Sequence, residues 1–92
     1  MFRLSIVVPI YNTEKYLKHC IESIINQLVS EVQLVLIDDG STDGSGAICD
    51  YYACRYPNQL KVIHKINAGL VAARKTGVEA SDGEYIGFVD SD

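Results

Sequence analysis

The sequence predicts an α/β fold: a Rossmann-like parallel sheet in which strands and helices alternate along the chain. Two observations support this, because four apolar runs have strand length and the segments between them have helical periodicity. The runs are Leu4–Val8, Val32–Ile37, Leu60–Ile63 and Tyr85–Val89. They are apolar on successive positions, which is typical of strands covered on both faces. The predicted element order is therefore β-α-β-α-β-α-β.

The first helix is expected between the first two apolar runs. Its apolar residues recur at intervals of three and four, the pattern of a helix packed on one face. They are Leu17, Cys20, Ile21, Ile24, Ile25 and Leu28. Asn12 or Thr13 is expected to cap the start of this helix. Glu14 falls in the first turn, where the helix dipole favours a carboxylate.

The second helix is expected over Ser45–Tyr56, with Thr42 or Asp43 as its cap and Pro57 ending it. The candidates for its buried side are Ile48, Tyr51, Tyr52 and Ala53.

The third helix is expected over Leu70–Ala80, where Ala72, Ala73 and Gly77 allow a close approach to the sheet. Connections between parallel strands are right-handed, and we predict the strand order 3-2-1-4. This order places the first two helices on one face and the third on the other. The fourth strand is then an uncovered apolar edge, so the isolated chain is expected to self-associate.

Composition limits the classes of protein that fit. A chain of 92 residues with 48% hydrophobic content can form one domain with a core. Its net charge of -4 argues against a nucleic-acid partner. Cys20, Cys49 and Cys54 have no metal-ligand spacing, and we expect them to be reduced, buried thiols. Without a signal-type leader or an apolar stretch of about 20 residues, the expected location is the cytoplasm.

Polar residues follow the carboxyl end of every predicted strand. The four clusters are Pro9–Asn12, Asp38–Asp43, His64–Asn67 and Asp90–Asp92. In open α/β sheets this edge binds the ligand. Each cluster also has a structural interpretation, because Asn12 and Thr42 can cap helices and Asp-Gly can form a turn. Four clusters on one edge favour a binding site.

The chemistry of this edge points to a phosphorylated ligand held through a metal. No glycine-rich loop follows the first strand, and the stretch Gly40–Gly46 has no lysine, so no phosphate cradle is predicted. The Asp-x-Asp pair, Asp90 and Asp92, supplies hard oxygen ligands that can hold a divalent cation against a diphosphate.

Four motifs resemble family 2 glycosyltransferases with the GT-A fold. They are V-P-I-Y-N-x-E-x-Y-L at 8–17, D-D-G-S-T-D at 38–43, N-x-G-L-x-x-A-R-x-x-G at 67–77 and G-E-Y-I-x-F-x-D-S-D at 83–92. The resemblance covers nearly the whole chain. It implies that residues 1–92 are the donor-binding portion of a longer GT-A domain, with the catalytic base after Asp92.

The resemblance also implies roles for individual residues. Asp39 would accept a hydrogen bond from the uracil imide, and Asp92 would bind Mg²⁺ or Mn²⁺. The other implied nucleotide-sugar-binding residues are Pro9, Tyr11 and Glu14 in the nucleotide pocket, Asn67 and Arg74 near the nucleotide or sugar, and Asp90 near the ribose.

Three side chains also have structural interpretations. Arg74 can be solvated or paired with Glu79 or Asp82. His19 and His64 are expected to be structural or surface residues, because neither has metal-ligand spacing.

The implied function is sugar transfer from a nucleotide-sugar donor, a UDP-sugar, to an acceptor hydroxyl. The resemblance implies an inverting, metal-dependent reaction in polysaccharide synthesis, with a glycan or lipid-linked glycan acceptor, at the cytoplasmic face of the membrane. Two alternatives remain open: a donor-binding fragment without turnover, and a sugar-nucleotidyltransferase. The second usually has a glycine-rich loop with Lys or Arg after the first strand, which is missing here.

Overall fold

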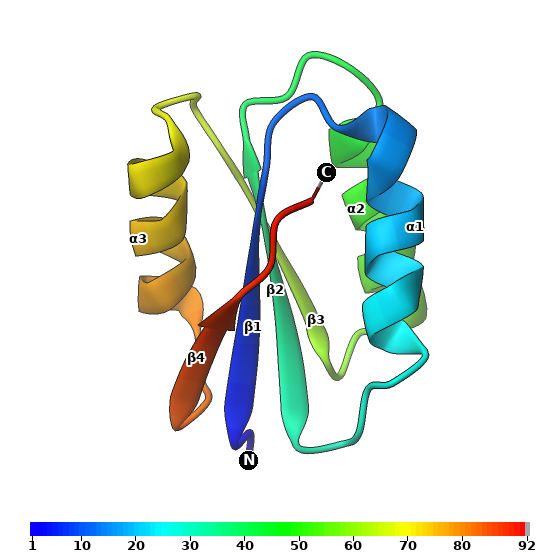
Figure 1. Cartoon of the computed structure of the whole chain (residues 1–92), viewed down its shortest axis with the longest axis vertical. Coiled ribbons are helices and arrows are strands. Elements are labelled where there is room, and N and C mark those ends of the chain that lie inside the picture. The colour runs from blue at the N-terminus through cyan, green and yellow to red at the C-terminus, as the bar shows by residue number, and fades with distance from the viewer. Residues whose placement is uncertain (92) are drawn as a thin grey trace.

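The computed structural model describes residues 1–91 and confirms the predicted α/β class (Figure 1). Its elements are β1 (Leu4–Ile10), α1 (Glu14–Ile25), β2 (Val32–Asp39), α2 (Ser45–Arg55), β3 (Leu60–Lys65), α3 (Leu70–Ala80) and β4 (Tyr85–Phe88). The strands are parallel and lie in the order β3-β2-β1-β4, as predicted. No helix within residues 1–91 is long and apolar enough to cross a membrane.

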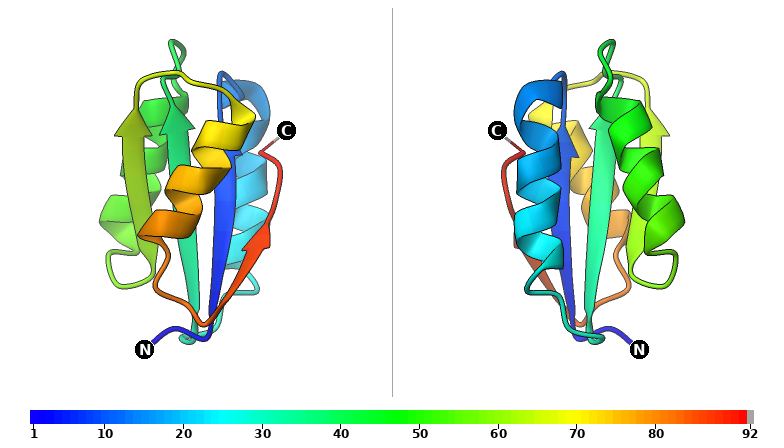
Figure 2. Two further views of the ribbon diagram at one scale, coloured as in Figure 1. Left: turned by 90° about the vertical axis from the view of Figure 1, so that its left-hand side faces the viewer. Right: turned by 90° about the vertical axis from the view of Figure 1, so that its right-hand side faces the viewer.

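Helices cover the two faces of the sheet unequally. Figure 2 shows α3 alone on one face and α1 with α2 on the other. Alternation along β2 sends Leu34 and Leu36 into the core beneath α1 and α2, whereas Val35 and Ile37 pack beneath α3. All four side chains are fully buried. The central strand is thus apolar on successive positions because both of its faces are covered.

Helix α1 buries Leu17 and Ile21 against the sheet, as its periodicity predicted. Its N-cap residue is Thr13, but the Thr13 side chain makes no capping hydrogen bond. The Thr13 hydroxyl instead donates to the Ser91 hydroxyl at 3.0 Å. The predicted side-chain cap is therefore wrong, because a contact with the distant C-terminal segment takes its place.

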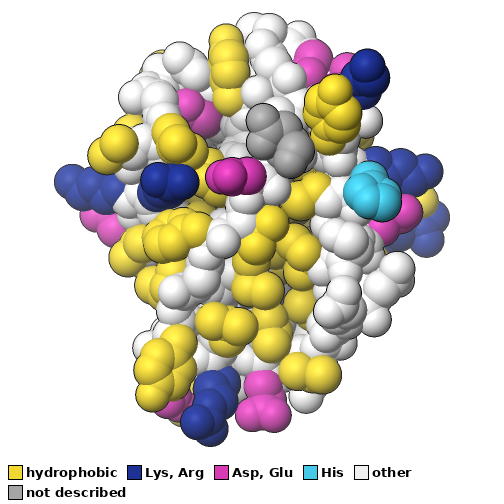
Figure 3. All heavy atoms as spheres, viewed as in Figure 1, with side chains coloured by type: hydrophobic (Ala, Val, Ile, Leu, Met, Phe, Trp, Pro, Cys, Tyr) yellow, Lys and Arg dark blue, Asp and Glu magenta, His cyan; other side chains and the backbone are white. Residues whose placement is uncertain are grey.

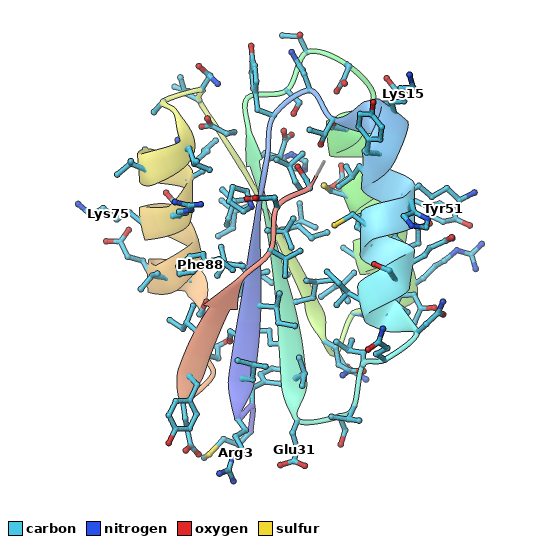
Figure 4. All side chains as sticks on the ribbon, in the orientation of Figure 1. Arg3, Lys15, Glu31, Tyr51, Lys75 and Phe88 are labelled. Atoms are coloured by element: carbon cyan, nitrogen blue, oxygen red, sulfur yellow. The ribbon has the colours of Figure 1, made fainter. Side chains whose placement is uncertain are left out.

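Helix α2 differs from its prediction at the start and on one face. The N-cap is Gly44 rather than Thr42 or Asp43, although the Asp43 carboxylate accepts a hydrogen bond from the Ser45 amide at 2.9 Å. Tyr51 was expected on the buried side but is 52% exposed and points away from the sheet (Figure 4). Its ring instead lies under the Arg55 guanidinium, 4.6 Å from the ring centroid.

Helix α3 approaches the sheet as closely as its small residues predicted. A Cβ atom at Gly77 would collide with the Val7 side chain of β1. Ala73 is fully buried one turn earlier, and Ala72 is half-buried. Small residues on this helix therefore set the distance between α3 and β1.

Strand β4 is a short edge strand with little cover. Tyr85, Ile86 and Phe88 are exposed, which confirms the predicted uncovered apolar edge, although the unbroken apolar run of this strand is typical of a strand covered on both faces. Figure 3 shows apolar side chains gathered on this side of the molecule. The strand ends at Phe88, although the Val89 amide still donates to the Val7 carbonyl at 3.1 Å. Self-association through this edge stays a prediction.

A partly buried network of polar groups holds the amino edge of the sheet together. The Ser5 hydroxyl donates to Gln33 Oε1 at 2.6 Å, and Gln33 Nε2 donates to the Asp82 carboxylate at 2.9 Å. The Gly83 amide donates to the Ser5 hydroxyl at 2.8 Å. These bonds join β1 and β2 to the turn before β4. They hold the strand that leads to the Asp90 segment.

The three cysteines form no disulfide within the described residues. Cys49 is buried, Cys20 is half-buried and Cys54 is exposed, so the expectation of buried thiols is correct only for Cys49. Burial, together with the nearby Asp38 and Asp50 carboxylates, raises the pKa of the Cys49 thiol to about 12. Cys49 is therefore a neutral, apolar core residue near pH 7.

Candidate functional site

The carboxyl edge of the sheet brings the predicted clusters together. Strands β2 and β3 run further than their apolar runs predicted, since β2 continues through Asp39 and β3 through Lys65. Asp38 is in register with His64, and Asp39 with Lys65. These polar residues therefore lie within the last positions of the strands rather than after them, because the ladder hydrogen bonds continue to the edge.

A pocket of about 260 Å³ opens at this edge, between the ends of β1 and β2 and the first turns of α3. Its lining residues are Pro9, Ile10, Tyr11, Asp39, Asn67, Gly69, Leu70 and Ala73. Pro9, Tyr11, Asp39 and Asn67 were all predicted to bind nucleotide sugar. The wall supplied by Leu70 and Ala73 was not predicted as part of a site. Their spacing of three on α3 is the signal that places both on one helix face.

Asp39 is the charged residue in the pocket wall and is 3% exposed. One carboxylate oxygen accepts hydrogen bonds from Lys65 Nζ at 2.9 Å and the Ala68 amide at 3.0 Å. The other accepts from the Gly69 amide at 2.9 Å and Asn67 Nδ2 at 3.1 Å. Asp39 thus holds the turn that leads into α3.

The ionised form of Asp39 is stabilised despite burial. Burial alone would raise the pKa of this carboxyl, but hydrogen bonds from Lys65, Ala68 and Gly69 and the Lys65 charge hold the pKa below its usual value of 3.8. Near neutral pH the pocket therefore contains a buried carboxylate. Four donors occupy the roughly four lone-pair positions of a carboxylate.

The turn after β2 requires a glycine. Gly40 has a φ of 72°, in the left-handed region that glycine adopts without steric cost. A Cβ atom there would also lie 2.6 Å from the Asn67 backbone nitrogen. Gly40 therefore lets the segment after β2 pass directly against the turn before α3, which brings Asp39 and Asn67 into one pocket.

A second set of contacts joins the start of α1 to the start of α2. Asn12 Oδ1 accepts from the amides of Thr42 at 2.8 Å and Asp43 at 3.3 Å. Glu14 Oε1 accepts from the Gly44 amide at 2.9 Å. Glu14 was predicted to line the nucleotide pocket, but it is not among the pocket's lining residues. Its bond to Gly44 holds the start of α2 in place, and its expected role in nucleotide binding stays a prediction.

Arg74 lies on α3, half-buried, one residue beyond Ala73. Its guanidinium lies 5.8 Å from the centroid of the Phe88 ring, beside α3 in Figure 4. Its Nε is buried and has no hydrogen-bond partner within residues 1–91. Within that part of the chain Arg74 forms no ion pair with Glu79 or Asp82; Asp82 lies 3.6 Å from Lys61. The pairing interpretation is therefore wrong, and the other expected role of Arg74 stays a prediction.

Asp90 and Ser91, the described part of the Asp-x-Asp segment, lie at the same edge. Asp90 is exposed, and its carboxylate makes no hydrogen bond or ion pair within the described residues. The adjacent Ser91 is buried and accepts the hydrogen bond from Thr13. The free Asp90 carboxylate fits the oxygen ligands that Mg²⁺ or Mn²⁺ prefers. Asp92, the predicted metal ligand, lies outside the described residues, and residues 1–91 contain no cluster of three candidate ligands.

A family comparison agrees with this geometry. The model of the family described as Glycosyl transferase family 2 matches residues 5–92. The chain belongs to this family. The resemblance expected from the four motifs is confirmed.

Two curated relatives illustrate the family. Glycosyltransferase GlyG of Streptococcus pneumoniae is 48% identical over 90 residues, covering 97% of this chain and 30% of GlyG. The minor teichoic acid biosynthesis protein GgaA of Bacillus subtilis is 44% identical over 93 residues, covering 96% of this chain and 21% of GgaA. The chain therefore spans less than a third of either relative.

A solved structure shows the same fold. S. aureus TarS 1-349, in complex with UDP-GlcNAc, superposes with a TM-score of 0.88 at 34% identity. The match covers 99% of this chain and 27% of that chain. The predicted GT-A fold is thereby confirmed for the family 2 chain described here.

Proposed function

We propose that this family 2 glycosyltransferase chain binds the nucleotide of a UDP-sugar in the pocket between β1, β2 and α3. The observation that carries the proposal is the convergence of Pro9, Tyr11, Asp39 and Asn67 on one pocket of about 260 Å³. A small pocket with apolar walls and a single buried carboxylate suits a planar base. TarS, which is similar over nearly the whole chain, binds UDP-GlcNAc, and this supports the same donor class here.

Base recognition follows from the exchange of one hydrogen bond. The Asn67 side chain is exposed, and its contact with the Asp39 carboxylate is the longest of the four, at 3.1 Å. An imide N–H takes that position on Asp39 when the base enters. Asn67 Nδ2 then donates to an adjacent carbonyl of uracil. Cytosine has no N–H at the same ring position, so the pair selects UDP over CDP.

The diphosphate extends from the pocket along the edge toward Asp90. Asp92, with Asp90 beside it near the ribose, would hold Mg²⁺ or Mn²⁺ there, and such a cation would supply positive charge against the leaving nucleoside diphosphate. Arg74, whose Nε is buried and has no hydrogen-bond partner within residues 1–91, contributes a positive charge on the α3 side of the edge. These residues serve donor binding and leaving-group departure.

Transfer to the acceptor completes the proposed reaction. A carboxylate outside residues 1–92 deprotonates the acceptor hydroxyl, which attacks the donor sugar with inversion. The acceptor is a glycan or a lipid-linked glycan of a cell-surface polymer, an assignment supported by the name of the relative GgaA. A donor-binding fragment without turnover is the second candidate, because the chain spans less than a third of its relatives.

Calorimetry tests the proposal. The wild-type protein, Asp92→Ala and Glu31→Ala are each titrated with UDP in Mn²⁺ and in chelator, and the wild type is also titrated with CDP. Glu31 is an exposed acid before β2, at the opposite edge, and serves as the control. We expect Mn²⁺ to tighten UDP binding to wild type and Glu31→Ala but not to Asp92→Ala. Equal UDP affinity with and without metal contradicts the metal assignment, and equal affinity for CDP contradicts the base assignment. A sugar-transfer assay of this chain and of a longer relative separates binding from turnover.

A further inference from the structure

His64 lies at the end of β3, directly behind the donor site. It is in register with Asp38 on β2, and these two side chains lie on the face beneath α2. His64 Nδ1 is 2.8 Å from Asp38 Oδ2, and His64 Nε2 is 2.8 Å from Asp50 Oδ1 on α2. One imidazole therefore joins the ends of two strands to a helix.

Both hydrogen bonds require a proton on the ring nitrogen. An ionised carboxylate only accepts hydrogen bonds, so an imidazole between two carboxylates donates from both nitrogens and carries a positive charge. The hydrogen bonds to Asp50 and Asp38 raise the pKa of His64 above its usual 6.5, although burial opposes the shift.

The other ionisable groups around His64 do not compete for it. From β2 the facing group is Asp38, and Asp39 points to the opposite face, where it binds Lys65. From α2 the facing groups are Asp50 and the neutral Cys49 thiol. The imidazolium thus has a carboxylate acceptor at each ring nitrogen, and 47% of its side chain is exposed to solvent.

Asp38 links His64 to the donor site through a chain of hydrogen bonds. Its other oxygen accepts from the Ser41 amide at 3.0 Å, and the Ser41 hydroxyl accepts from the Asn12 amide at 3.1 Å. Asn12 directly follows Tyr11, which lines the donor pocket. The path from His64 to the pocket wall is therefore continuous.

Gly46 shows how tightly Asp38 is enclosed. A Cβ atom on Gly46 would lie 2.8 Å from the Asp38 carboxylate and 3.5 Å from His64 Cε1. The first turn of α2 therefore closes over the carboxylate, and only a residue without a side chain fits there. Asp38 is 5% exposed as a result.

We propose that His64 is a positioning residue of the donor site: as an imidazolium shared by Asp38 and Asp50, it fixes Asp38, and Asp38 fixes the Ser41–Asn12 contact beside the pocket. The inference rests on the proposed donor function. Beyond that function, we infer that the affinity for the donor depends on the protonation of His64, although His64 does not contact the donor.

Two substitutions separate the two ring nitrogens. Asparagine at 64 places its amide nitrogen near the position of Nδ1 and keeps the donor to Asp38. Glutamine places it near Nε2 and keeps the donor to Asp50. In UDP titrations at pH 6.5, we expect H64N to stay within about twofold of wild type and H64Q to lose about tenfold, the effect of one charge-assisted hydrogen bond.

The pH profile provides the readout that a merely structural role would not move. Because the folded pKa of His64 is raised, the imidazolium's contribution to the stability of this contact is complete below the ordinary value of 6.5 and is lost as pH rises through the raised value, where the neutral ring keeps one N–H and no longer donates to both Asp38 and Asp50. Wild-type UDP affinity should fall over that range, whereas H64N, which does not titrate, should have a flatter profile.

Amide exchange at Ser41 gives a result that needs no ligand. We expect faster exchange in H64Q than in H64N, measured on folded protein by NMR. Equal Ser41 exchange in the two variants, or equal UDP affinity of H64Q and wild type, would overturn the proposal. Failure of wild type to bind UDP would overturn the proposed function instead, and Ser41 exchange would still decide whether His64 positions Asp38.

Discussion

The two faces of the sheet are built for different tasks. Beneath α1 and α2 lies the larger core, centred on Leu17, Ile21, Leu34 and Leu36. Beneath α3 the buried core comprises Val7, Val35, Ile37 and Ala73. The smaller core stops below the carboxyl edge, and the pocket opens there. The larger core therefore lies on the face covered by α1 and α2. The face covered by α3 has a smaller core and carries the binding pocket.

Two adjacent aspartates show the same division. Alternation along β2 directs Asp38 toward α2, where His64 and the Ser41 amide bind it. Asp39 points the other way and accepts bonds from Lys65 and the turn before α3. Both carboxylates are buried, yet only Asp39 lines the pocket. One carboxylate supports the site from behind and the other forms its wall.

The largest expected loss of stability comes from substitutions in the two cores, which can be compared directly. Leu36→Ala should lower the free energy of unfolding by about 3–5 kcal/mol, because it leaves a cavity in the larger core. Ile37→Ala should cost about 2–3 kcal/mol, because the smaller core beneath α3 can relax toward the open pocket. Urea unfolding of both variants measures the difference. A larger loss for Ile37→Ala would break the proposed division between the faces.

The next largest effect on the free energy of unfolding, together with its pH dependence, is expected at Asp39. Asp39→Ala should cost about 1.5–3 kcal/mol, since it removes a buried acceptor of charge-assisted bonds. The folded pKa is lowered, so the contribution of Asp39 is present above its unfolded pKa and is lost as pH falls through the folded value. Wild-type stability should therefore fall in acid more steeply than that of Asp39→Ala. Parallel pH profiles would show that Asp39 is not held as described.

The smallest effect concerns the spacing between α3 and the sheet. Gly77→Ala should destabilise by about 1–2 kcal/mol, because the new methyl group collides with Val7 and pushes the helix outward. In an exposed helix the same change would stabilise by about 1 kcal/mol. Lys75→Ala, on the exposed side of α3, is the control. Thermal melts of both variants show whether Gly77→Ala is less or more stable than the wild type. A more stable Gly77→Ala would contradict the close packing of α3 against β1.

Local patterns in the sequence predicted the elements, their order and the edge that holds the site. The apolar run of β2 marked a strand because both of its faces are covered. The buried ends of the strands were missed, since Asp38 and Asp39 interrupt the apolar pattern while remaining in the sheet. Their burial depends on Lys65 and His64, which come from another strand. Tertiary partners of this kind leave no local signal.

Side-chain partners explain the other differences. Glu14 matched a motif, but its carboxylate binds the Gly44 amide, about 30 residues away. Tyr51 fitted the apolar spacing of α2, yet Tyr52 rather than Tyr51 reaches the core. The apolar pocket wall at Leu70 is visible only once α3 is packed against β1. The motifs therefore predicted that the site lies at the carboxyl edge of the sheet. Which residues line the pocket depends on how the helices and strands pack together.

Chemical-shift mapping with UDP and Mg²⁺ tests the central claim most directly. The two faces each offer a hollow: the pocket beside α3, and a groove of about 380 Å³ between α1 and α2 that is lined in part by Tyr51 and Tyr52. We predict that the amides of Tyr11, Asn67 and Gly69 shift with UDP concentration while those of Tyr51 and Tyr52 do not. Shifts confined to the α1–α2 groove would contradict the account.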